Sequence, residues 1–103
     1  MLSPSLLSPQ AWQDALDIVR YIAADNPDVA ARFVPAVEAT CAQLLALPGM
    51  GSVQNVVHEG LQDVWVLSVT GFEHYLIFYT SVGKHVQVIR ILHAARDFPT
   101  IFN

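Results

Sequence analysis

The sequence predicts an α+β domain in which a two-helix hairpin packs on an antiparallel sheet. Three observations lead to this prediction. From Gln10 to about Leu47, apolar residues recur at helical spacing, and after residue 60 they alternate every second residue, as in strands. The connections within each half are only a few residues long, which makes consecutive elements antiparallel. With 103 residues the chain has room for one hydrophobic core, so we expect a single domain over residues 1–103.

The first predicted elements are a short strand and a helix. Residues 2–8 are expected to form a short N-terminal edge strand, because Pro4 is tolerated only at an edge or before a strand. Ser8 followed by Pro9 is typical of a helix start, with serine as N-cap and proline at the first position. The first helix should run over Gln10–Ala24. Its apolar residues fall on two neighbouring lines, Trp12, Leu16, Val19 and Ala23 on one and Ala15, Ile18 and Ile22 on the other.

A second helix is predicted over Pro27–Leu47. Asn26 and Pro27 repeat the cap-and-proline start, and the Pro-Gly pair at 48–49 ends the helix. Pro35 lies inside this stretch, so we expect either a kink there or a later helix start. The expected buried stripe is Ala30, Phe33, Val37, Cys41 and Leu44.

Residues 52–60 are predicted as a loop, and three strands follow it. The strands are Gln62–Val69, Glu73–Thr80 and Lys84–Leu92, joined by glycine-containing turns into a meander. With the edge strand, the sheet should have three to four strands. The last strand is apolar on both faces, which predicts a central position, with Arg90 on the face of Val86, Val88 and Leu92.

Composition narrows the classes of function. The chain has five Lys or Arg against nine Asp or Glu, a net charge of −4, which argues against strong direct binding to nucleic acid. Its apolar runs are shorter than a membrane span requires, and its first ten residues lack a signal-peptide pattern, so we expect a cytoplasmic protein with no membrane partner. The four histidines show no metal-site spacing, Cys41 is alone, and no phosphate-binding glycine loop is present, so no metal or cofactor is expected.

The candidate functional residues gather where the last strand ends. Arg90, His93, Arg96 and Asp97 form a strand-end cluster in a chain with few cations. One interpretation is structural: Arg90, Arg96 and Asp97 fasten the tail to the sheet, with Asp97 or a helix C-terminus as acceptor for Arg90. The other is a small cationic site for a phosphate or an acidic partner group. Four large apolar residues near the ends of the chain are candidates for a docking surface: Trp12, Phe98, Ile101 and Phe102.

The order of several short motifs resembles the ParE branch of the RelE/ParE toxins of type II toxin–antitoxin modules, also called plasmid stabilisation proteins. These motifs are "LSPQAW", "DIVRYIAADNP", "LPGMG", "YLIFY" and "VIRILHAARD", and the likeness spans residues 7–97. The resemblance implies a RelE-like fold, inhibition of DNA gyrase, and a cognate antitoxin that covers an apolar surface in a toxin–antitoxin hetero-oligomer. It also implies that the strand-end cluster is the family's most recognisable motif.

Departures from the family pattern leave three hypotheses. Gln62 and Thr80 stand where relatives often have arginine, and Pro35 interrupts the second helix. The first hypothesis is a gyrase inhibitor that acts by binding rather than catalysis. The second is a ribosome-dependent endoribonuclease using Arg90, His93, Arg96 and Tyr79, which the low count of basic residues disfavours. The third is an attenuated toxin that only binds its antitoxin. We favour the first on the resemblance.

Overall fold

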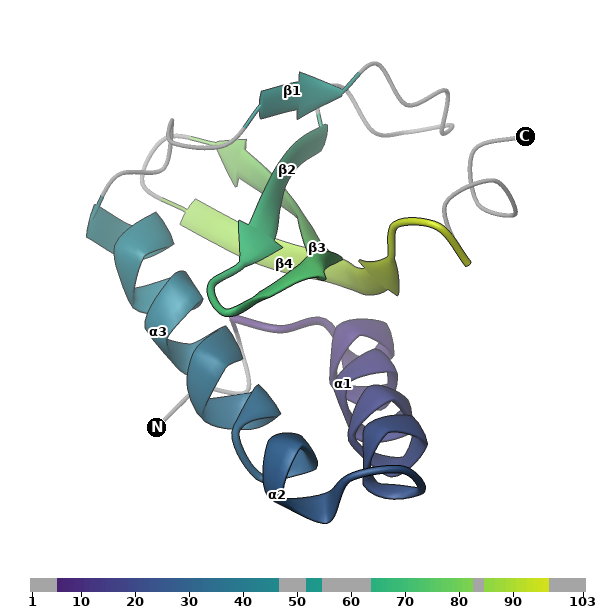
Figure 1. Ribbon diagram of the computed structural model, residues 1–103. Coiled ribbons are helices and arrows are strands. Elements are labelled where there is room, and N and C mark those ends of the chain that lie inside the picture. Colours follow the sequence, from purple (N-terminus) through teal and green to yellow (C-terminus); the bar gives the residue numbers. More distant parts are fainter. Residues whose placement is uncertain (1–5, 47–51, 55–63, 83–84, 97–103) are drawn as a thin grey trace.

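Helices cover one face of an antiparallel four-stranded sheet in the computed structural model of the chain, which confirms the predicted α+β class (Figure 1). The structure describes residues 6–46, 52–54, 64–82 and 85–96. The strand order is β1-β2-β3-β4, so neighbours in the sheet are also neighbours in sequence. In chain order the elements are α1 (Pro9–Ala23), α2 (Pro27–Ala30), α3 (Phe33–Ala46), β1 (Ser52–Gln54), β2 (Val64–Val69), β3 (Phe72–Val82) and β4 (His85–His93).

Both predicted helix starts are confirmed by their caps. The Ser8 side chain accepts a hydrogen bond of 3.1 Å from the backbone N–H of Ala11, and Pro9 follows as the first helical residue. The Asn26 side chain accepts one of 3.2 Å from the backbone N–H of Val29. Each cap satisfies an N–H that has no partner within its own helix, and this fixes where the helix begins.

The second predicted helix is divided in two. α2 ends at Ala30, and a turn at Ala31 and Arg32 separates it from α3, so the helix is interrupted as expected, but just before Phe33 rather than at Pro35 itself. Pro35 lies in the first turn of α3, where the missing N–H would have no intrahelical acceptor. The N–H of Ala36 makes the first bond of this helix, 3.1 Å to the carbonyl of Arg32.

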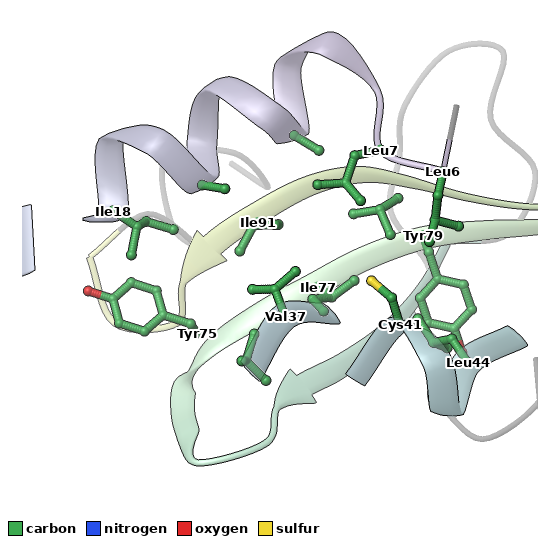
Figure 2. Close-up of a cluster of buried hydrophobic side chains, with 14 of the residues drawn as sticks. Leu6, Leu7, Ile18, Val37, Cys41, Leu44, Tyr75, Ile77, Tyr79 and Ile91 are labelled. Carbon is green, nitrogen blue, oxygen red and sulfur yellow. The ribbon is translucent and has the colours of Figure 1, made fainter. Parts of the chain in front are cut away.

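The main core lies between the helices and the sheet (Figure 2). The predicted stripe of the second helical segment is confirmed, since Phe33, Val37, Cys41 and Leu44 are all buried. The stripe predicted for the first helix is partly wrong, because Leu16 is 44% exposed. α1 is buried along the second predicted line, at Ala15 and Ile18, and it also buries Ala11 and Asp14, which were not predicted.

The core assignment also accounts for the apolar character of the second helical segment. Pro27–Ala46 is long and apolar enough, by length and composition, to cross a membrane. This stretch consists of α2 and α3, separated by a turn, and its side chains Phe33, Val37 and Leu44 belong to the core. The ring of Phe33 meets the rings of Phe72 and Tyr75 edge to face, with centroids 5.2 and 5.3 Å apart.

The sheet begins earlier in the chain than predicted. Residues 52–60 were expected to be loop, but β1 pairs antiparallel with β2, with Val53 opposite Trp65. A three-residue strand carries too little alternation to be recognised from sequence. Thr70 and Gly71 join β2 to β3, and Gly71 has φ of +83°, a conformation that side chains with a Cβ rarely adopt.

The N-terminal segment completes the free edge of β4. Leu7 forms a parallel bridge with Val88, and this confirms an edge pairing within the predicted residues 2–8. The N–H of Ser8 donates to the carbonyl of Val88, and the N–H of Val88 donates to the carbonyl of Leu6, both at 2.8 Å. β4 is therefore last in the meander rather than central, but its outer edge is paired here.

A bulge in β4 overturns the predicted distribution of its side chains. Tyr79 lies opposite Val88 but Phe78 lies opposite Arg90, so Ile89 is an extra residue. Before the bulge, Val88 faces the helices, and after it Ile91 does so. Strict alternation had predicted that Arg90 and Val88 share a face of the sheet. Because of the bulge, they lie on different faces. Leu92 and Ile89 belong to a second cluster, separate from the main core, with Val64 and Phe78.

Candidate functional site at the end of β4

Arg90 forms a two-pronged ion pair with Asp14 of α1. Its Nε lies 2.8 Å from Oδ2 of Asp14, and its Nη2 lies 3.1 Å from Oδ1. Asp14 is 8% exposed, and the side chain of Arg90 is 31% exposed. This parallel arrangement is the strong geometry for an arginine and a carboxylate, and it is shielded from water mainly on the aspartate side.

The acceptor that the structure gives Arg90 was not predicted. Asp97 or a helix C-terminus had been expected, whereas Asp14 comes from the middle of a helix, and Asp97 lies outside the described residues. Asp14 also accepts a 3.0 Å hydrogen bond from the backbone N–H of Ile91, just after the bulge, and a 3.4 Å bond from the side chain of Gln10. One carboxylate thus neutralises Arg90 and satisfies an edge N–H of β4.

Ser8 makes a second connection to the bulge. Its hydroxyl accepts the capping bond of α1 and donates a 3.0 Å bond to the carbonyl of Ile89. Ser8 and Asp14 thereby hold the start of α1 against the irregular part of β4. The sequence does contain a signal for Asp14, because it falls on the same helical line as Ala11, Ala15 and Ile18, where a lone acidic residue needs a partner.

His93 organises the turn that follows β4. Its Nδ1 accepts hydrogen bonds from the backbone N–H groups of Ala95, at 3.2 Å, and Arg96, at 3.1 Å. The N–H of Ala94 donates a 2.8 Å bond to the carbonyl of His74. An Nδ1 that accepts is unprotonated, so the ring proton of the neutral imidazole lies on Nε2. This network fixes the backbone that carries Arg96.

Aromatic rings surround His93. The ring of His74 is stacked on it, with centroids 6.0 Å apart and planes 17° apart. The ring of Tyr75 meets it edge to face at 5.1 Å. On the other side of the turn, the guanidinium carbon of Arg96 lies 4.4 Å from the ring centroid of Tyr21, near the end of α1. Sequence reasoning missed Tyr21 and His74, because only the fold brings α1 and the start of β3 to this turn.

Tyr79 does not join the other candidate catalytic residues. It is fully buried, lies opposite Val88, and its ring is stacked on that of Trp65 with centroids 6.3 Å apart. His93 lies opposite Tyr75, four positions along the same strand, a separation of about 13 Å at the usual rise of a strand. The structure therefore brings His93 and Arg96 into one turn, places Arg90 on Asp14, and leaves Tyr79 in the core.

The remaining candidates and possible ligand groups can be placed only in part. Trp12 is half-buried on α1 and packs against the core, while Phe98, Ile101 and Phe102 lie outside the described residues. No group of three or more His, Cys, Asp or Glu within the described ranges could hold a metal ion. Cys41 is buried, and burial, followed by the charge of Glu38, raises the pKa of its thiol from 9.0 to about 11.

A comparison with models of protein families shows to which family the chain belongs. The model of the ParE toxin of the type II toxin–antitoxin system, parDE, matches residues 6–98. The chain belongs to the ParE toxin family. The match runs from Leu6, which pairs with β4, to beyond the turn that carries His93 and Arg96, so both ends of the candidate site fall within it.

A solved structure supports the fold of this ParE family member. The chain is similar to one from the structure titled "Chromosomal ParDE TA system from P. aeruginosa", with a TM-score of 0.67 and 18% sequence identity. The similarity covers 84% of this chain and 90% of the other. A search of curated proteins gives no significant match.

Proposed function

We propose that this ParE family member is a cytoplasmic toxin that inhibits DNA gyrase by binding to it, and that a cognate antitoxin neutralises it. The observation that carries the proposal is the family match over residues 6–98, which includes every element of the fold that the structure describes. The structural similarity to a chain of a ParDE system supports an antitoxin as partner. Gyrase as the target follows from the resemblance to ParE toxins.

The geometry favours binding over catalysis. An endoribonuclease of this fold would need Arg90, His93, Arg96 and Tyr79 near one scissile phosphate. Arg90 is paired with Asp14, and Tyr79 is buried four strand positions from the residue opposite His93. The chain also carries a net charge of −4, which opposes the approach of RNA. We therefore assign target contact to His93 and Arg96, with Asp97, and a structural role to Arg90.

The antitoxin would cover apolar surface. Trp12 is half-buried on α1, and Leu16, one helical turn further along, is 44% exposed. Large side chains of this kind at a protein surface are typical of the centre of an interface. We assign these two residues, together with Phe98, Ile101 and Phe102, to the contact with the antitoxin in a hetero-oligomer.

The test combines a biochemical and a cellular measurement. The purified chain is titrated into a DNA supercoiling assay with purified gyrase, and it is also expressed in bacteria without an antitoxin. Concentration-dependent loss of supercoiling, together with filamentation and a DNA damage response at a normal translation rate, is expected. Rapid loss of translation with cleaved mRNA would instead identify a ribonuclease. Normal growth at confirmed soluble expression would identify an attenuated toxin, with Gln62 and Thr80 as the positions to restore to arginine.

A further inference from the structure

We infer that Tyr21, His74, His93 and Arg96 form one preorganised surface that recognises a carboxylate-bearing segment of the target protein. We call these four residues the Tyr21–Arg96 surface. The inference rests on the proposed function, because it specifies how the toxin would contact its target. It adds two residues, Tyr21 and His74, that lie far from the strand-end cluster in sequence.

The surface is composite. Tyr21 comes from the last turn of α1, His74 from the start of β3, and His93 and Arg96 from the end of β4 and the turn after it. Figure 1 shows the end of β4 above the helix α1 that supplies Tyr21. Direct contacts link all four: Arg96 lies over the ring of Tyr21, His93 accepts a hydrogen bond from the N–H of Arg96, and His74 is stacked on His93.

Core packing does not account for this arrangement. Tyr21 is 63% exposed, and His74 and Arg96 are exposed as well. A cation–π contact at an exposed position contributes little to stability, and the fold has a buried core of its own. By contrast, tyrosine and arginine held near the surface are the residue types that dominate binding energy in protein interfaces.

Preorganisation makes the arginine suitable for binding. Two backbone bonds to Nδ1 of His93 hold the turn, the N–H of Ala94 holds it to β3, and the ring of Tyr21 supports the guanidinium. A partner that binds here therefore loses little affinity to ordering of the side chain. The stacked guanidinium keeps a planar donor edge, whose geometry matches a carboxylate.

Charge favours an acidic protein segment over a nucleic acid. Among the described arginines other than Arg96, Arg90 pairs with Asp14, and Arg20 lies 3.5 Å from Asp17 on the surface of α1. Nucleic-acid binding requires several cations along the phosphate backbone, and a chain with a net charge of −4 repels a polyanion at distance. A single carboxylate on a protein needs only one well-placed arginine with neighbouring donors.

The test uses four variants of the full chain: Tyr21→Ala, Tyr21→Phe, Arg96→Ala and Arg96→Lys. Each is assayed for inhibition of gyrase supercoiling, toxicity in cells, and thermal unfolding. Matched controls are Leu45→Ala, which removes a similarly exposed apolar group on α3, and Arg32→Ala, which removes an exposed arginine between α2 and α3. The Tm of the variants should fall by no more than about 5 °C, since only exposed contacts are lost.

We expect Arg96→Ala and Tyr21→Ala to raise the inhibitory concentration at least about tenfold, as is usual for central interface residues. Tyr21→Phe keeps the ring beneath Arg96 and should stay close to the unsubstituted protein. Arg96→Lys keeps the charge but loses the planar fork, and should fall between the two. Raising the salt concentration should weaken inhibition by the unsubstituted protein more than by Arg96→Ala, because a charged contact has been removed from the variant.

The failures of the two proposals are distinguishable. Full gyrase inhibition by both alanine variants would overturn the surface and leave the proposed function intact. The surface would also be wrong if these variants lost only antitoxin binding, or only binding to a DNA duplex, while inhibition stayed unchanged. If the unsubstituted protein is toxic without inhibiting gyrase and both alanine variants lose toxicity, gyrase is the wrong target but the surface stands. A chain that is neither toxic nor inhibitory overturns both.

Discussion

Asp14 and Arg90, separated by 76 positions in the chain, meet in a two-pronged ion pair that joins α1 to the bulge of β4. The carboxylate is nearly buried and also accepts the N–H of Ile91, so its two oxygens satisfy three donors around the bulge. A shared acceptor of this kind couples three elements of structure: the helix, the arginine side chain and the edge of the strand. This explains why one of the few arginines of the chain lies inside a strand.

Removing Arg90 should destabilise the fold. Arg90→Ala leaves a buried carboxylate without its counter-charge, and we expect the free energy of unfolding to fall by about 2–4 kcal/mol, below the full cost for a wholly buried pair because Arg90 is partly exposed. Urea denaturation measures the change. Arg32→Ala serves as control and should stay within about 0.5 kcal/mol. A double-mutant cycle with Asp14→Ala should show a smaller loss than the sum of the single losses, and strict additivity would argue against the pair.

Thr40 should be more sensitive to loss of its hydroxyl than its size suggests. Its Oγ1 donates a 2.8 Å bond to the carbonyl of Ala36 and accepts a 3.0 Å bond from the N–H of Thr70, so it connects α3 to the β2–β3 turn. Thr40→Val keeps the shape but removes the acceptor, and we expect a loss of about 1–2 kcal/mol in the free energy of unfolding. Thr40→Ser keeps the hydroxyl. If it were destabilised as much as the valine variant, packing rather than hydrogen bonding would explain the effect.

The raised pKa of the Cys41 thiol predicts that the free energy of unfolding decreases at alkaline pH. Burial, and then the charge of Glu38, raises the pKa of its thiol from 9.0 to about 11. Between these values the unfolded chain has lost the proton while the folded chain keeps it, so the folded state binds more protons and the free energy of unfolding decreases as pH rises. The contribution of one group has a slope of at most about 1.4 kcal/mol per pH unit.

Denaturation curves of the unsubstituted protein and of Cys41→Ala, measured from pH 8 to pH 11, isolate this contribution. Cys41→Ala should have a lower free energy of unfolding at every pH because a cavity replaces the sulfur. Above pH 9, however, its free energy of unfolding should fall less steeply with pH than that of the unsubstituted protein. Parallel curves would show that the thiol ionises alike in the folded and the unfolded state.

Gly71 should tolerate added volume but not a changed backbone. An added Cβ would meet no atom within 4 Å, whereas φ of +83° is unfavourable for residues with a side chain. We expect Gly71→Ala to lower the free energy of unfolding by about 1–2 kcal/mol and Gly71→Asn by less, since asparagine tolerates positive φ better. Thermal unfolding of the two variants is the measurement. Equal losses in both would point to a contact rather than to backbone conformation.

A substitution of Tyr79 distinguishes the gyrase-inhibitor hypothesis from the ribonuclease hypothesis. It is fully buried beside Trp65, so Tyr79→Phe should leave toxicity in cells unchanged and alter stability only modestly. Growth inhibition and mRNA integrity are measured after induced expression. Loss of toxicity in a variant that melts normally would restore Tyr79 as a functional group and favour the ribonuclease hypothesis.

Local sequence signals were sufficient for the helices. Serine or asparagine followed by proline located the starts of α1 and α2, since capping depends only on residues within one turn. Pro35 indicated that the second helical segment would be irregular, for the same local reason. The apolar stripe of α3 was also correct, because the helix is regular and packs on one side.

The errors concern features that only the assembled fold decides. The bulge at Ile89 shifts the register, so simple alternation placed Arg90 on the wrong face. The acceptor Asp14 and the ring of Tyr21 both lie on α1. The residues near them in sequence do not indicate that they contact Arg90 and Arg96. The structure does bring His93 and Arg96 together at the strand end, but Tyr21 and His74, which contact them, come from other parts of the chain.

The pairing of the two ends of this fold has a consequence for its synthesis. Leu7 pairs with Val88 and Asp14 pairs with Arg90, and both of these partners lie on β4, the last strand that the structure describes. A ribosome makes the N-terminal segment first. Until residues up to His93 have emerged, Asp14 lacks Arg90 as its ion-pair partner, and the apolar side of α1 lacks its contacts with β4. Until that strand has emerged, the nascent chain therefore lacks the partners that hold α1 and the turn carrying Arg96 in place.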